Sequence, residues 1–100
     1  MTTNERVIQA IFSALEEVNQ QLLKEQRLEK SIDTVLLGES GHLDSVGLVT
    51  LIVATEEKIE EEFGVSITLT DKRALSQKES PFKTIGMLTN YIVLLLGEKA

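Results

Sequence analysis

Apolar residues recur every three or four positions in three long stretches of the chain, which is the period of an amphipathic helix. The first stretch spans residues 4–24, and Asn4 stands where an N-cap residue is expected. The second spans residues 45–63 and is followed by Gly64, the residue type that favours the left-handed position after a helix. The third follows Thr84, again a good N-cap. The stripes are Val7, Ile11, Leu15, Val18 and Leu22; then Leu48, Ile52, Ile59 and Phe63, flanked by Val49 and Val53; then Ile85, Leu88, Ile92 and Leu95.

The segments between these helices differ in character. Residues 26–43 break the helical period, with two glycines and two serines, but contain apolar positions too numerous for a free tether. We expect a packed loop there, in which Ile32, Val35, Leu36 and Leu37 lie across the bundle. Residues 65–70 alternate like a strand, but no partner strand is evident, so an extended connector is expected. A helical turn is expected at residues 71–75.

Composition supports a single helical domain. The chain has 100 residues, 42% of them hydrophobic, with four aromatic residues and no tryptophan. Cysteine is absent, which excludes disulfides, thiolate zinc sites and thiol nucleophiles, so any thiol chemistry must come from a cofactor. The apolar run "YIVLLLG" is too short to span a bilayer and no apolar leader opens the chain, so we expect a cytoplasmic protein that does not enter the membrane.

Negative charge is concentrated in one part of the chain. The formal net charge is −6 at pH 7, and residues 44–63 alone carry six acidic residues and one lysine. Nucleic acid is not an expected partner, because phosphate contacts require clustered lysine and arginine. A protein with a basic surface fits better. The acidic run is either a solvated helix face or a docking surface, and the candidate docking residues are Glu56, Glu57, Glu60 and Glu61.

The stretch "GHLDSVGLVTLI" contains the main candidate for chemistry. Asp44 is a good N-cap and Ser45 would be the first helical residue, so the pair could serve only to cap the helix. A phosphate on the Ser45 hydroxyl, however, would lie beside free backbone amides and the positive end of the helix dipole. The apolar stripe behind it would offer a cleft for an apolar cargo. Ser45 is therefore either part of a cap or an attachment point for a phosphodiester.

At these residues the chain resembles the acyl carrier proteins and their peptidyl and aminoacyl carrier relatives. The resemblance rests on "LDSVGLVTLI", on the acidic helix ending "EEEFGVSI" and on "FKTIGMLTNYI", and it covers about residues 4–96. It implies a four-helix bundle with a short third helix and 4′-phosphopantetheine attached to Ser45. A phosphopantetheinyl transferase would take this group from coenzyme A and contact Asp44. The thiol of the cofactor would then carry acyl groups as thioesters between enzymes.

The chain departs from the usual carrier pattern at several positions. Val46 follows the serine where leucine is common, and Gly47 and Thr50 stand where carriers of fatty acid synthesis show acidic residues. The acidity lies near the end of the helix, which is about one turn longer than usual. These departures favour a dedicated carrier of a specialised pathway over one that serves the general fatty acid synthase enzymes. The expectation is a monomeric, non-catalytic carrier for fatty acid, polyketide or a related specialised pathway, with an aminoacyl or peptidyl carrier as the alternative. The expected acyl cavity, facing the first and last helices, is lined by Leu48, Val49, Ile52, Val53, Ile59 and Phe63.

The residues around Ser45 also bear on three other kinds of function: a hydrolytic enzyme, a metal site and an interaction module. His42, Asp44 and Ser45 do not suit a catalytic triad, because the imidazole must lie between the hydroxyl and the carboxylate and these residues are too close in sequence. A lone histidine beside scattered carboxylates is also weak evidence for a metal site. A helical interaction module with an unmodified serine stays open. It differs from a carrier only in the fate of the Ser45 hydroxyl.

Overall fold

The computed structural model describes residues 2–21, 28–36, 45–69 and 81–99, and these residues form an all-α structure. Three helices are present among them: α1 (Thr3–Asn19), α2 (Ser45–Phe63) and α4 (Ile85–Lys99). The bounds of α2 are those that its sequence pattern predicts. The short helix expected at residues 71–75 lies outside the described residues, so the count of four helices stays a prediction. None of the described helices has the length and apolarity needed to cross a membrane.

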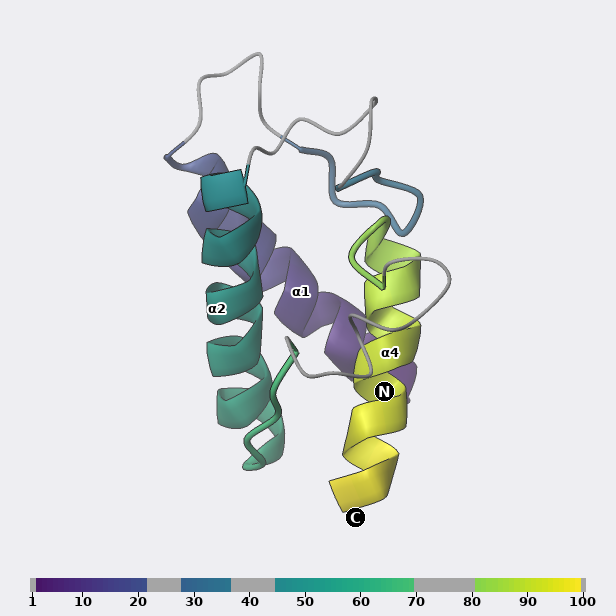
Figure 1. Ribbon diagram of the computed structural model, residues 1–100. Coiled ribbons are helices and arrows are strands. Elements are labelled where there is room, and N and C mark those ends of the chain that lie inside the picture. The colour runs from purple at the N-terminus through teal and green to yellow at the C-terminus, as the bar shows by residue number, and fades with distance from the viewer. Residues whose placement is uncertain (1, 22–27, 37–44, 70–80, 100) are drawn as a thin grey trace.

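Helix α1 is the element that joins the other two. Figure 1 shows α2 and α4 standing side by side, with α1 crossing obliquely behind both of them. The contacts between helices run mainly through α1, which packs against α2 and against α4. The apolar stripes predicted for α1 and α4 are buried as expected, apart from Leu22, which lies outside the described residues. These buried residues are Val7, Ile11, Leu15 and Val18 of α1 and Ile85, Leu88, Ile92 and Leu95 of α4.

Local hydrogen bonds mark where each helix begins and ends. Thr2, rather than the expected Asn4, caps α1, because its Oγ1 accepts a bond of 3.2 Å from the Glu5 amide. Thr84 caps α4 as predicted, with its Oγ1 3.1 Å from the Met87 amide nitrogen. Gly64 has a φ of 68°, the left-handed conformation predicted for the residue after α2.

Helix α1 is shorter than the sequence pattern predicts because its last residue pairs with the returning chain. The Asn19 side chain donates to the Leu28 carbonyl and accepts from the Leu28 amide, both at 2.9 Å. These two hydrogen bonds use both the nitrogen and the oxygen of the side-chain amide and hold residue 28 against the end of α1. Leu28 is buried there, so the segment that follows starts from a fixed point on the bundle.

Residues 28–36 pack against the start of α4, as the packed-loop prediction requires, but mainly through their backbone. Val35 and Thr84 form an isolated antiparallel bridge. The carbonyls of Thr34 and Ile32 accept bonds from the first two amides of α4, at 3.2 and 2.8 Å, which satisfies donors that a helix start leaves unpaired. Leu36 is fully buried, whereas Ile32 is 51% exposed, contrary to expectation, because its carbonyl and not its side chain makes the contact.

The alternating pattern predicts an extended connector at residues 65–70, and residues 65–69 form one, while Thr70 lies outside the described residues. Ile67 and Leu69 are buried while Ser66 and Thr68 are exposed, and no strand is assigned in this segment. The Leu69 amide donates to Glu56 Oε2 at 3.3 Å, which ties the connector back to α2. The alternation therefore comes from one side of an extended chain packing on a helical core.

The close approach of Ile32 to Gly86 gives a testable prediction. A Cβ at Gly86 would lie 3.1 Å from the Ile32 carbonyl oxygen, whereas one at Gly97 would meet nothing within 4 Å. Gly→Ala inside a helix normally stabilises by up to about 1 kcal/mol. We expect Gly97→Ala to raise the free energy of unfolding measured in urea and Gly86→Ala to lower it. Equal stabilisation by both substitutions would mean that residues 28–36 yield easily and do not hold the start of α4.

Candidate functional site

Ser45 is the first residue of α2, as the sequence predicts. The first amides of an α-helix have no acceptor within the helix, and the dipole places partial positive charge beside them. The first turn of α2 contains no acidic residue, so a negatively charged group on Ser45 would meet no like charge within that turn. Val46, the next residue, is 74% exposed. Asp44 and His42 lie outside the described residues, and the predicted cap stays a prediction.

A row of valines continues from this end along the outer face of α2. Val46, Val49 and Val53 are 74%, 59% and 48% exposed. Their spacing of three and four residues places them on one face of the helix. We call these three residues the valine stripe. The expectation that Val49 and Val53 face the first and last helices is therefore wrong.

Val49 and Val53 are exposed because a different face of α2 packs on the core. Apolar residues surround the first half of the helix, so their period does not select one face. Helix α2 instead buries Leu51 and Thr55 completely, two residues that the predicted stripe leaves out. The spacing of four between Leu51, Thr55 and Ile59 is the signal that identifies this face. Among the six residues expected to line an acyl cavity, Ile52 and Ile59 are buried, Leu48 and Phe63 are half-buried, and Val49 and Val53 are exposed.

Thr55 is an unusual member of the core. Its Oγ1 is buried and has no hydrogen-bond partner among the described residues. Thr50 and Thr89, by contrast, donate at 2.8 Å to the carbonyls of Val46 and Ile85, each one helical turn earlier. An unsatisfied buried hydroxyl destabilises a fold, since it loses its bonds to water without replacement.

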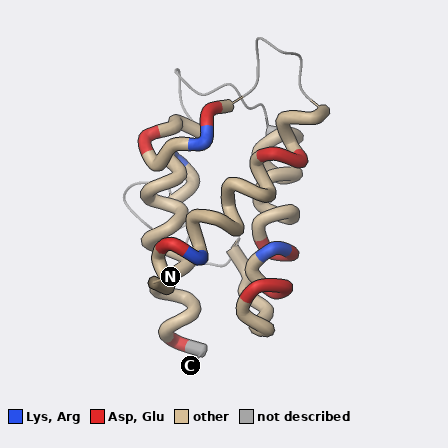
Figure 2. Tube along the Cα trace, turned by 180° about the vertical axis from the view of Figure 1, so that it is seen from behind, with Lys and Arg blue, Asp and Glu red and all other residues tan. Residues whose placement is uncertain are grey.

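The acidic residues lie on the second half of α2. Glu57, Glu60 and Glu61 are exposed, and Glu57 and Glu60 extend the valine stripe at helical spacing. Figure 2 shows the acidic turns of α2 gathered in the half of the helix away from its first residue. Glu56 differs, because it is only half exposed and binds the Leu69 amide. Glu56, although a candidate docking residue, therefore also makes a contact within the fold.

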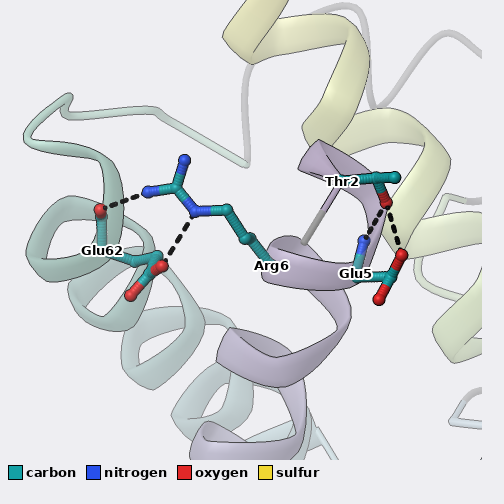
Figure 3. A network of polar contacts seen from close by, with 4 residues as sticks. All are labelled: Thr2, Glu5, Arg6 and Glu62. Carbon is teal, nitrogen blue, oxygen red and sulfur yellow. Dashed lines mark hydrogen bonds and ion pairs between the residues drawn. The ribbon is translucent and has the colours of Figure 1, made fainter.

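Two ion pairs connect this half of α2 to α1. Arg6 Nε lies 2.9 Å from Glu62 Oε1, and its Nη2 donates to the Glu62 backbone carbonyl at 3.0 Å (Figure 3). The same guanidinium lies 4.3 Å from the centre of the Phe63 ring. Lys58 Nζ lies 3.1 Å from Glu17 Oε1, and this hydrogen bond is the main cause of a raised pKa of Lys58. Cations from both helices thus bridge the α1–α2 contact.

An apolar crevice among the described residues lies at the far end of α2 from Ser45. It has a volume of about 420 Å³ and is lined mainly by Phe63, Val65, Val93 and Leu96, with Arg6 at its edge. Phe63 is the last residue of α2, about 27 Å from Ser45 at the standard helical rise. The crevice does not adjoin Ser45, and the acyl cavity stays a prediction.

Comparisons with protein-family models, with curated proteins and with solved structures find no match for this chain. Among the described residues there is also no group of three or more histidine or acidic side chains arranged to hold a metal ion.

The unsatisfied hydroxyl of Thr55 gives a prediction for the stability of the bundle. Thr55→Val replaces the hydroxyl with a methyl group of similar shape, and we expect it to raise the free energy of unfolding in urea by about 1 kcal/mol. Thr89→Val is the matched control, because that hydroxyl is bonded to the Ile85 carbonyl, and it should bring no such gain. A loss of stability in Thr55→Val would mean that the hydroxyl has a partner in solution, such as a buried water molecule.

Proposed function

We propose that this protein is an acyl carrier that holds acyl intermediates as thioesters on a 4′-phosphopantetheine arm attached to Ser45. The observation that carries the proposal is that α2 begins at Ser45, with the exposed Val46 next to it and no acidic residue in the first turn. The amides of that turn suit a phosphodiester, because its negative charge would lie at the positive end of the helix dipole. The residues present thus fit the cofactor that the resemblance to carrier proteins implies.

In the loading reaction, the Ser45 oxygen would form a new ester bond to the phosphorus of phosphopantetheine. Adenosine 3′,5′-bisphosphate would leave coenzyme A, and a base of the transferase would take the hydroxyl proton. The thiol at the end of the arm would then supply the acyl-bearing group, which the chain, with no cysteine, lacks. Asp44, as the acidic neighbour of Ser45, would contact the transferase.

The outer face of α2 is the docking surface in this proposal. Its valine stripe adjoins Ser45, and its exposed acidic residues Glu57, Glu60 and Glu61 follow along the second half of the helix. A partner enzyme would therefore present an apolar patch near its active site and basic residues farther along the helix. Apolar contact would hold the complex, while opposite charges would guide and orient its formation.

The proposal allows fatty acid, polyketide and related specialised pathways, with an aminoacyl or peptidyl carrier as the alternative cargo class. An unmodified interaction module would use the same outer face of α2. That function gives no reason for a serine at the start of a helix whose first turn carries no acidic residue, and this favours the carrier. The two functions are separated by whether Ser45 is modified.

Loading of Ser45 is the first test. We expect incubation with coenzyme A and a phosphopantetheinyl transferase of broad specificity to add a single phosphopantetheine group, measured by intact mass. Ser45→Ala should take up none while retaining its helical circular dichroism. If folded protein stays unmodified with several different transferases, the carrier proposal is wrong and the unmodified interaction module is favoured.

Charge reversal tests the docking surface separately. We expect Glu60→Lys and Glu61→Lys each to lower the kcat/KM of loading by about three- to tenfold at low ionic strength, because they repel a basic partner. Glu29→Lys is the control, since it makes the same charge change at an exposed residue outside α2. The effect should shrink at about 1 M salt, where exposed charges are screened. Equal rates for all three variants would contradict docking through these acidic residues.

A further inference from the structure

Lys58 is the single basic residue of α2, and it lies within the acidic half of the helix. Its ammonium group does not extend over the outer face. It lies 3.1 Å from Glu17 Oε1 of α1, and the Lys58 side chain is only 27% exposed. The lysine is therefore drawn to the flank of α2, between the outer face and the core.

The alternative position for this ammonium group is beside Glu61. Residues three apart on a helix are surface neighbours, so Glu61 is within reach of a flexible lysine side chain. The carboxylates of Glu61 and Glu57 also raise the pKa of Lys58, although less strongly than Glu17 does. Without Glu17, the lysine would pair with carboxylates of its own helix. That pairing would place positive charge at the edge of the surface that faces a basic partner.

We propose that Glu17 is a positioning residue for the docking surface, which holds Lys58 against α1 and so leaves Glu61 available to a basic partner. This inference rests on the proposed function, because it assumes that partners bind the outer face of α2. It assigns to α1 a part in partner selection, although no residue of α1 lies on that face. Glu17 acts through Lys58 and need not contact the partner.

Glu17→Gln and Glu16→Gln form a matched pair of variants for the test. Glu16 and Glu17 are adjacent, both exposed, and each pairs with a lysine, at 3.3 Å for Lys30 and 3.1 Å for Lys58. Each substitution removes one negative charge and releases one lysine, but only Glu17→Gln releases a lysine of α2. Exposed pairs contribute little to stability, so both variants should fold.

We expect the kcat/KM of loading to be about two- to fivefold lower for Glu17→Gln than for Glu16→Gln at low ionic strength. The difference should disappear at about 1 M salt. Adding Lys58→Gln to Glu17→Gln restores the net charge of the wild type and should restore its rate. A structural role for Glu17 alone would not give this rescue, because the double variant still lacks the pair.

Binding of a lysine homopeptide to the unmodified protein separates this inference from the proposed function. Affinity should follow the same order, with Glu17→Gln weaker than Glu16→Gln and the double variant restored. Equal affinities for the two single variants, with weaker binding by Glu61→Lys, would overturn the role of Glu17 and leave the docking surface intact. Failure of the wild type to be loaded would overturn the carrier proposal, while the peptide measurements would still decide the role of Glu17.

Discussion

Burial of the apolar stripe of α1 is the constraint on which the rest of the structure depends. Helix α1 lies against both α2 and α4, and Ala10 and Ala14 are buried within this stripe. Small side chains at these positions allow close approach of the neighbouring helices. Because α1 occupies the side of α2 that carries Leu51 and Thr55, the opposite side of α2 is turned to solvent. The exposure of the valine stripe therefore follows from the choice of packing face for α1.

The ion pairs between α1 and α2 determine the arrangement of charge more than they determine stability. An exposed pair contributes roughly 0–1 kcal/mol, less than the burial of one large apolar side chain. Arg6 nevertheless supplies the positive charge that the end of α2 lacks, since no basic residue occurs in its last turn. Glu17 in turn draws Lys58 away from the outer face. The two pairs together leave the acidic residues of that face exposed.

The sequence predicted the elements that depend on local signals. Ser45 as the first residue of α2, Gly64 after its end and Thr84 as the cap of α4 each follow from one residue type in one position. The single apolar stripe of α1 also identified its core face. Such features need no information about the rest of the chain, because short-range hydrogen bonds and backbone preferences determine them.

Features that depend on distant partners could not be predicted in this way. The end of α1 at Asn19 depends on a double hydrogen bond to Leu28, and the contact of Glu56 depends on the Leu69 amide. The packing face of α2 was missed because its first half is apolar on every side, so only the position of α1 decides between Leu51 and Val49. The sequence thus predicted the position of Ser45 at the start of α2 but not the exposure of Val49 and Val53 along the face that continues from it.

Among the described residues, the valine stripe takes no part in the packing of the core. Three exposed β-branched residues lower the helix propensity of α2 relative to alanine or glutamate and leave apolar surface in water. An apolar surface of this kind beside a candidate attachment residue favours contact with another protein. An interaction module without modification accounts for the stripe but leaves its position beside Ser45 unexplained. A carrier accounts for both, because the partner that handles the arm must bind next to the residue that bears it.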